Sequence, residues 1–270
     1  MKRLLSLLAV LAAVVGVRAA DAPGLVNGNP PDMRTLKSGD AAPDFELLGI
    51  DGKKHKLAEY TGGEVLVVLF TSNHCPTSHS IERRLQKFYD EYKPKGVKLV
   101  AINPNHPDGL SKDELGYGEF GDSYAEMKPY AEKNKWTFDY LYDGDTQTIA
   151  RAYGCLATPH VFVFDKNLKL RYQGRFDDSR FYDDTTVKSK DCQNAVDAIL
   201  AGKPVEVELT KPMGCSTKWR EKKALHDAKH EAWAQTPVSV ELIDKEGIAK
   251  LRANTSNKYR LRSEEHTSEL

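Results

Sequence analysis

The 270-residue chain has little cysteine and no net charge. Its 39 basic residues balance 39 acidic ones, which excludes the basic surface expected of a nucleic-acid-binding protein. Four cysteines are too few to staple a disulfide-rich scaffold, although they suffice for one redox pair and one structural bridge. With 40% hydrophobic and 29% charged residues, the composition is that of a globular protein and not of a disordered or fibrous one.

Long apolar runs are missing after the first residues of the chain. Lys2 and Arg3 precede an almost wholly apolar stretch, residues 4–17, which ends in small residues around Arg18. This is the pattern of a secretory signal peptide, and the stretch is shorter than the roughly 20 residues that span a bilayer. No cysteine directly follows it to carry a lipid anchor. We therefore expect residues 1–20 to direct export to the periplasm or beyond, with no stable membrane insertion after signal cleavage.

Composition divides the rest of the chain into segments. Clusters of Gly, Pro, Asn and Asp mark extended connections, whereas alternating strand and helix patterns mark a folded domain. The predicted segments are an extended leader (21–39), a folded domain (40–202), a linker with a charged helix (203–237), the start of a truncated second domain (238–261) and a C-terminal stretch (262–270). The last stretch resembles a translated sequencing adapter, so we interpret it as an artefact.

The folded domain is predicted to contain a central parallel strand pair. Residues 65–70 (VLVVLF) form a continuous apolar run of strand length, typical of a strand buried on both faces. Apolar residues at helical spacing follow, and residues 97–102 form a second such run, which predicts a strand–helix–strand unit. Further predicted elements are a helix at 123–133, a strand at 138–142, a helix at 146–153, a hairpin over 161–172 and a helix at 192–200. The sequence thus predicts an α/β fold, with a central mixed sheet flanked by helices.

Cys75 stands between the first buried strand and the next helix. Open α/β sheets place their chemistry at this edge, and a helix N-terminus lowers the pKa of a thiol. The helix dipole contributes only about 0.3–1 kcal/mol, less than the ~1.4 kcal/mol of one pKa unit, so a further group must help. His74 and His79 are the candidate neighbours. The alternative is a buried, inert thiol.

Two motifs of the domain resemble those of a known family. Cys75-Pro76-Thr77-Ser78 follows a buried strand, and Thr158-Pro159 directly precedes another. Over residues 40–202 this order resembles the thioredoxin superfamily, in its redoxin branch (alkyl hydroperoxide reductase/thiol-specific antioxidant-like). The resemblance implies a thioredoxin-like fold with Cys75 as the nucleophile and His74 tuning its thiol. It also implies that Thr158 and Pro159 form a cis-proline loop that orients the substrate backbone.

The sequence departs from that family at several positions. Ser78 replaces the second cysteine of Cys-x-x-Cys, and Ser72 stands where some exported relatives have a cysteine two residues before His74. A serine cannot resolve a mixed disulfide. Cys75-Pro76-Thr77 resembles the peroxiredoxin motif, but Val68 replaces its proline, and Pro159 stands where the peroxiredoxin arginine usually precedes the strand.

The remaining cysteines suggest a pairing. Cys215, within Gly-Cys-Ser-Thr-Lys-Trp, resembles an element of the same exported group, which implies that it resolves the mixed disulfide on Cys75. Cys155 and Cys192 are then candidates for a structural disulfide. Four cysteines allow three pairings, and a free or structural Cys215 is the alternative.

The resulting functional hypothesis is an exported thiol-disulfide oxidoreductase of the redoxin type. Its partners would be protein thiols or disulfides and an exported or membrane-linked reductant. The alternatives are a thiol peroxidase and a redox-inactive binding module that kept the fold. A copper or zinc site formed by Cys75, His79 and His160 would lack the second cysteine expected of such sites, so we expect neither a metal nor another cofactor.

Overall fold

The computed structural model describes residues 24–237 and a few isolated positions beyond them (246, 247, 249 and 253). The predicted signal peptide and adapter-like stretch lie outside the described residues, as does nearly all of the predicted second domain. The chain divides into two compact units, residues Met1–Lys229 and His230–Leu270. No helix among the described residues combines the length and the apolar character needed to cross a bilayer.

A seven-stranded mixed sheet organises the first unit. Its central strands β3, β4 and β5 run parallel, and the flanking pairs β1–β2, β1–β5, β3–β7 and β7–β8 are antiparallel. The strand order is β2-β1-β5-β4-β3-β7-β8. The strands are β1 Glu46–Gly49, β2 Lys54–Lys56, β3 Val65–Phe70, β4 Val97–Asn103, β5 Asp139–Tyr142, β7 His160–Asp165 and β8 Leu170–Gly174. The predicted mixed sheet is therefore confirmed.

Helices connect and cover these strands. The α-helices are α1 Pro76–Tyr92, α2 Tyr124–Lys133, α3 Thr148–Tyr153, α4 Asp191–Leu200 and α5 Lys223–Gln235. The 3-10 helices are η1 Leu57–Tyr60, η2 Lys93–Lys95, η3 Pro107–Gly109, η4 Lys112–Tyr117, η5 Asp184–Thr186 and η6 Arg220–Lys222. A second, two-stranded sheet pairs β6 Ala157–Thr158 with β9 Cys215–Ser216. The predicted strand–helix–strand unit corresponds to β3, α1 and β4.

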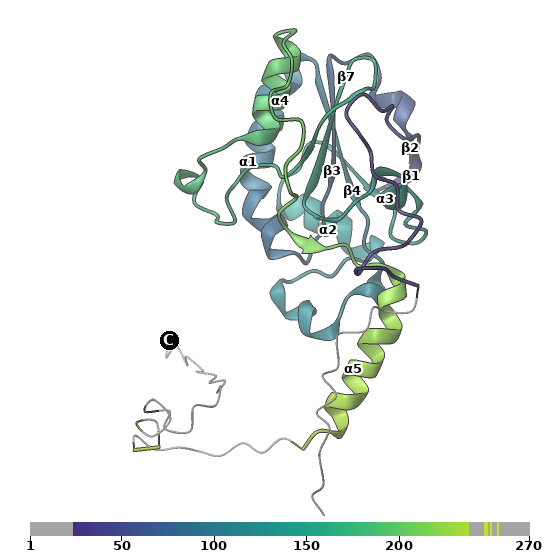
Figure 1. Ribbon diagram of the computed structural model, residues 1–270, viewed down its shortest axis with the longest axis vertical. Coiled ribbons are helices and arrows are strands. Elements are labelled where there is room, and N and C mark those ends of the chain that lie inside the picture. Colours follow the sequence, from purple (N-terminus) through teal and green to yellow (C-terminus); the bar gives the residue numbers. More distant parts are fainter. Residues whose placement is uncertain (1–23, 238–245, 248, 250–252, 254–270) are drawn as a thin grey trace, which may run out of the picture. The chain divides into compact units, whose positions relative to one another are not determined.

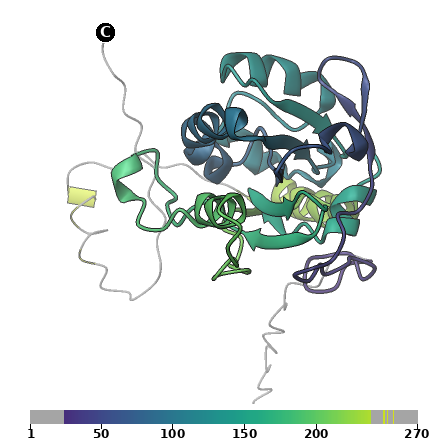
Figure 2. The same cartoon turned by 90° about the horizontal axis from the view of Figure 1, so that it is seen from above.

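The sheet separates two hydrophobic cores. Val65, Val67 and Leu69 of β3 face a core that includes side chains of α1, α2 and α4. The alternate residues of β3 face a second core, which α3, η1 and the segment before β1 cover. Figure 1 shows α1 and α4 on one side of the sheet and α3 on the other, and Figure 2 shows that the loop carrying η5 projects from the body of the unit. This two-sided burial explains the continuous apolar runs of β3 and β4.

The segment expected to be a linker is part of the first unit. Thr210 donates its backbone N–H to the carbonyl of Gln173 on β8, and Trp219 is wholly buried in the second core. The charged helix expected within this segment begins at Lys223, after the buried residues 217–219 and η6. Residues 203–222 therefore pack against the folded domain instead of leading away from it.

Candidate redox site

Cys75 lies between the end of β3 and the start of α1. It is the N-cap residue of α1, and Pro76 occupies the first turn, where its missing N–H costs no hydrogen bond. The Cys75 side chain is wholly buried. The structure thus confirms the predicted position of Cys75 at a helix N-terminus.

The loop before β7 contacts the Cys75 sulfur. The Thr158–Pro159 peptide bond is cis, as the resemblance implied. The Cys75 thiol donates to the carbonyl of Thr158 at 3.1 Å, and the Thr158 hydroxyl is 2.9 Å from the hydroxyl of Ser72. Thr158 therefore contacts two residues more than 80 positions earlier in the chain, Cys75 through its carbonyl and Ser72 through its hydroxyl.

Cys215 lies on the strand that pairs with this loop. Strand β9 pairs antiparallel with β6, so that Cys215 is opposite Thr158. Its side chain is partly exposed and acts on the sulfur of Cys75, whose pKa it lowers. The structure therefore brings together the two cysteines that the sequence resemblance paired.

The neighbourhood of Cys75 favours its thiolate. The hydrogen bond from the Cys215 thiol is the largest influence holding the pKa of Cys75 below that of an ordinary thiol. Burial opposes it, whereas the backbone N–H groups of Ser78 and Cys215 and the charge of His74 lower the pKa further. The same hydrogen bond, together with burial, raises the pKa of Cys215. Cys75 therefore ionises before Cys215, and the remaining proton of the pair stays on Cys215.

A buried carboxylate that the sequence analysis missed positions His74. Asp122, between β4 and α2, accepts hydrogen bonds from the backbone N–H groups of Asn73 (2.8 Å) and His74 (3.2 Å). Its other oxygen is 2.5 Å from Nδ1 of His74 and accepts a bond from the Asn105 amide at 2.7 Å. These bonds keep the pKa of Asp122 low in spite of complete burial. No local pattern links residues 48 positions apart, so a single sequence offers no signal for this contact.

Two buried polar atoms beside Cys75 have no hydrogen-bond partner among the described residues. They are Nε2 of His74, the residue before Cys75, and Oγ of Ser78, the third residue after it. Buried polar groups are normally paired.

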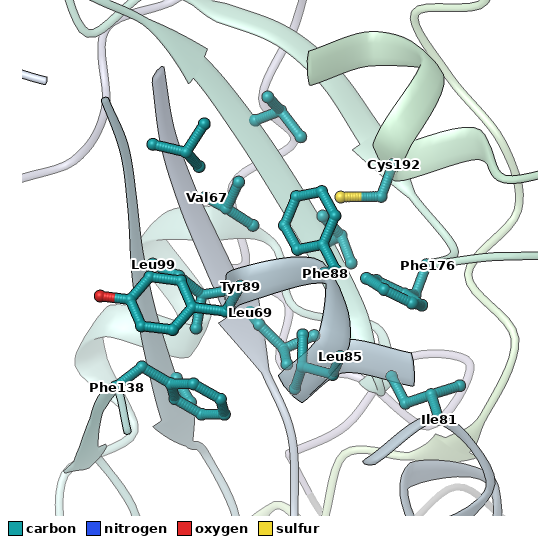
Figure 3. Packing of buried hydrophobic residues seen from close by; sticks show 14 of the residues in the cluster. Val67, Leu69, Ile81, Leu85, Phe88, Tyr89, Leu99, Phe138, Phe176 and Cys192 are labelled. Atoms are coloured by element: carbon teal, nitrogen blue, oxygen red, sulfur yellow. The ribbon is translucent and has the colours of Figure 1, made fainter. Parts of the chain in front are cut away.

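The predicted bridge between Cys155 and Cys192 is wrong. Cys192 lies in the core of α1, α2 and α4, where Figure 3 shows it among Phe88 and Phe176, whereas Cys155 lies in the core on the opposite face of the sheet. Both thiols are free, and burial raises the pKa of each, that of Cys155 to about 12. A disulfide requires Cα atoms within about 7 Å of one another, which the intervening sheet prevents.

The histidines considered as metal ligands have other roles. His79 is hydrogen-bonded through Nε2 to the carbonyl of Asn73 at 2.5 Å. His160 is buried in β7 and receives the backbone N–H of Leu156 at 3.3 Å, while burial lowers its pKa to about 3. In the part of the chain that the structure describes, no three His, Cys, Asp or Glu side chains gather as a metal site would require.

The mixed sheet, the cysteine at the start of α1 and the cis-proline loop before β7 define a protein of the thioredoxin-like fold. Within that class, the chain belongs to the AhpC/TSA family, whose model matches residues 38–173.

The relatives of this chain include enzymes of thiol chemistry. The thiol-disulfide oxidoreductase ResA of Geobacillus thermodenitrificans is 27% identical over 133 residues, which are 49% of this chain and 66% of ResA. Peroxiredoxin Bcp of Escherichia coli is 30% identical over 115 residues, 43% of this chain and 63% of Bcp. The chain thus spans slightly less than two thirds of the length of these relatives. An uncharacterized conserved protein of Geobacillus kaustophilus is similar in structure, with 36% identity, a TM-score of 0.61 and coverage of 69% of this chain and 94% of that one.

Proposed function

We propose that this protein is an exported thiol-disulfide oxidoreductase of the redoxin type, with Cys75 as the nucleophilic thiolate and Cys215 as the resolving thiol. The observation that carries the proposal is that β9 places Cys215 opposite Thr158, whose carbonyl contacts the Cys75 sulfur. The Cys215 thiol at this position lowers the pKa of Cys75. The thiolate, and not the thiol, attacks disulfides. The similarity to ResA supports the same chemistry.

The reaction proceeds in two exchanges. The Cys75 thiolate attacks one sulfur of a partner disulfide, which forms a mixed disulfide and releases the other partner sulfur as a thiolate. Cys215 then attacks the Cys75 sulfur, its proton passes to the departing partner sulfur, and the Cys75–Cys215 disulfide forms. Two electrons pass from the cysteine pair to the partner. A dithiol reductant, exported or membrane-linked, restores the pair by the reverse exchange.

Residues around the pair assist these steps. Thr158 and Pro159 orient the partner backbone beside the sulfur, consistent with the contact from Cys75 to the Thr158 carbonyl. His74, held through Nδ1 by Asp122, favours the thiolate through its charge. Neither role requires a cofactor.

The test is to map the disulfides of the mature protein by mass spectrometry, before and after one equivalent of a thiol oxidant. We expect a Cys75–Cys215 bond to appear on oxidation, while Cys155 and Cys192 stay free. Cys75→Ser serves as the control and forms no new bond. A Cys75 that remains free and unmodified contradicts the proposal and indicates a binding module that kept the fold.

Peroxide distinguishes the peroxidase alternative, which the similarity to Bcp favours. The reduced protein is mixed separately with hydrogen peroxide and with a disulfide such as oxidised glutathione. We expect Cys75 to react faster with the disulfide. Faster consumption of peroxide would overturn the assignment in favour of a thiol peroxidase.

Export rests on residues 1–20, which lie outside the described residues. Sequencing the N-terminus of the protein recovered from an expressing bacterium tests it. A mature chain that starts near Ala20 or Asp21 supports export, and an intact Met1 contradicts it.

A further inference from the structure

The backbone edge next to the cis-proline is already occupied in this protein. A thioredoxin-like site offers the residue before that proline to the extended backbone of a partner, the role proposed above for Thr158. Here β9 pairs with that edge, with Cys215 opposite Thr158 and Ser216 opposite Ala157. The pairing continues as Thr217 donates its N–H to the Leu156 carbonyl at 3.4 Å.

Gly214 packs so closely against this edge that a larger residue would clash with it. A Cβ atom at Gly214 would lie 2.0 Å from the carbonyl oxygen of Thr158, well inside van der Waals contact. That same oxygen accepts the Cys75 thiol. Residues 213–217, here called the strap, therefore lie against the group that contacts the reactive sulfur, and Cys75 has no exposed surface.

The chain holds the strap in place on its C-terminal side. Thr217 donates its hydroxyl to the Cys155 carbonyl at 2.9 Å, and Lys218 donates its backbone N–H to the Asn105 side chain at 2.8 Å. The buried Lys218 ammonium also pairs with Glu114. Trp219 is wholly buried. The strap is thus a specific contact of the folded unit.

We propose that the strap occupies the place of a partner's extended segment, so that Cys75 meets an external disulfide only after the strap has left β6. This inference rests on the proposed function and adds its regulation. In the reduced protein only noncovalent contacts keep the strap on β6, and a cysteine-bearing peptide of a partner competes for the same backbone groups. Once Cys75 and Cys215 have given two electrons and the Cys215 proton to the partner disulfide, the covalent Cys75–Cys215 bond holds the strap on β6. The oxidised protein is therefore closed, and the reduced protein opens.

Alkylation of the reduced protein tests whether the strap shields Cys75. Iodoacetamide is added at about pH 9.5, above the ~8.5 of a free thiol, so that Cys75 is ionised with or without its contact to Cys215. The modification of each cysteine is followed by mass spectrometry. We expect Cys75 to react slowly for a thiolate in the wild type and at least tenfold faster in Gly214→Ala, because the added methyl group forces the strap off Thr158. Gly116→Ala is the matched control, since no atom lies within 4 Å of a Cβ at that exposed glycine. Equal rates at Cys75 in Gly214→Ala and wild type would overturn the inference.

Two further measurements show whether the variant remains folded and whether the strap responds to oxidation in the wild type. Cys155 and Cys192 are wholly buried, so their protection reports that Gly214→Ala remains folded. Amide hydrogen exchange of the wild type needs no variant, and we expect residues 213–217 to exchange more slowly in the oxidised than in the reduced protein. Identical exchange in both states contradicts redox control of the strap.

The outcomes separate this inference from the proposed function. If a Cys75–Cys215 disulfide forms but Gly214→Ala leaves the Cys75 rate unchanged, the redox pair stands and the strap is no barrier. If no disulfide forms but Gly214→Ala exposes Cys75, the strap shields Cys75 and the proposed redox function fails.

Discussion

The acidity of the Cys75 thiol depends on Cys215, a residue 140 positions further along the chain. A helix N-terminus supplies only about 0.3–1 kcal/mol to a nearby anion. The thiol of Cys215 makes the larger contribution here, and burial works against it. The resolving residue is therefore also the group that activates the nucleophile.

This dual role predicts different effects for two substitutions of Cys215. In Cys215→Ala the donor is lost, and we expect the pKa of Cys75 to rise by about one unit or more, toward the ~8.5 of a free thiol. Cys215→Ser cannot resolve a mixed disulfide but keeps a hydroxyl donor, so its Cys75 pKa should stay lower than that of the alanine variant. The thiolate absorbance near 240 nm, followed against pH, measures both. Equal Cys75 pKa values in the two variants would show that the Cys215 hydrogen bond has no such effect.

At the scale of elements, the site is assembled where secondary structures end. Cys75 is the N-cap residue of α1, Thr158 ends β6, and Cys215 begins β9. At one of these ends the Thr158 carbonyl contacts the Cys75 sulfur. Helix α3, directly before the cis-proline loop, depends in turn on Asp143, whose carboxylate accepts the backbone N–H of Ala150 at 2.7 Å.

Asp143 predicts a pH-dependent stability. Burial raises its pKa from 3.8 to about 7, so the folded protein holds this proton more tightly than the unfolded chain. The stabilisation is complete below about pH 4 and is lost as the pH rises to about 7, by at most roughly 4 kcal/mol at ~1.4 kcal/mol per unit. We expect Asp143→Asn to flatten the decline of the unfolding free energy between pH 4 and 7, as measured by urea denaturation. The exposed Asp145→Asn is the matched control and should keep the wild-type slope, and an unchanged slope in Asp143→Asn would refute the assignment.

At the scale of the whole molecule, the folded unit is larger than its family match. The family model covers residues 38–173, yet Leu25, Leu36 and Trp219 all belong to the second hydrophobic core. Segments before and after the matched region therefore complete that core. The strap that carries Cys215 is anchored by this packing.

This packing predicts that Trp219 stabilises the entire unit. Replacing a wholly buried tryptophan by alanine typically costs about 3–5 kcal/mol, so we expect Trp219→Ala to lower the free energy of unfolding by that amount. Trp233, which is 48% exposed on α5, supplies the comparison, and Trp233→Ala should change the stability by less than about 0.5 kcal/mol. Denaturant unfolding monitored by circular dichroism measures both. A Trp219→Ala protein as stable as the wild type would show that the C-terminal segment is not part of the core.

Local patterns along the chain were sufficient to predict the central elements of the fold. The apolar runs of β3 and β4 and the Cys75-Pro76 helix start follow from periodicity and from the backbone geometry of proline, which act over a few residues. Segment boundaries were less accurate where tertiary contacts decide them, since the segment expected to be a linker contains Trp219, which is wholly buried.

Contacts between distant segments were beyond such patterns. Asp122 reaches His74 only because β4 lies beside β3 in the sheet, and spacing alone could not show that Cys155 and Cys192 face opposite cores. Sequence resemblance paired Cys215 with Cys75, but the occupation of the Thr158 edge by its strand emerged from the folded chain. Periodicity places a residue on one face of its own element, whereas the packing of elements against one another determines which faces meet.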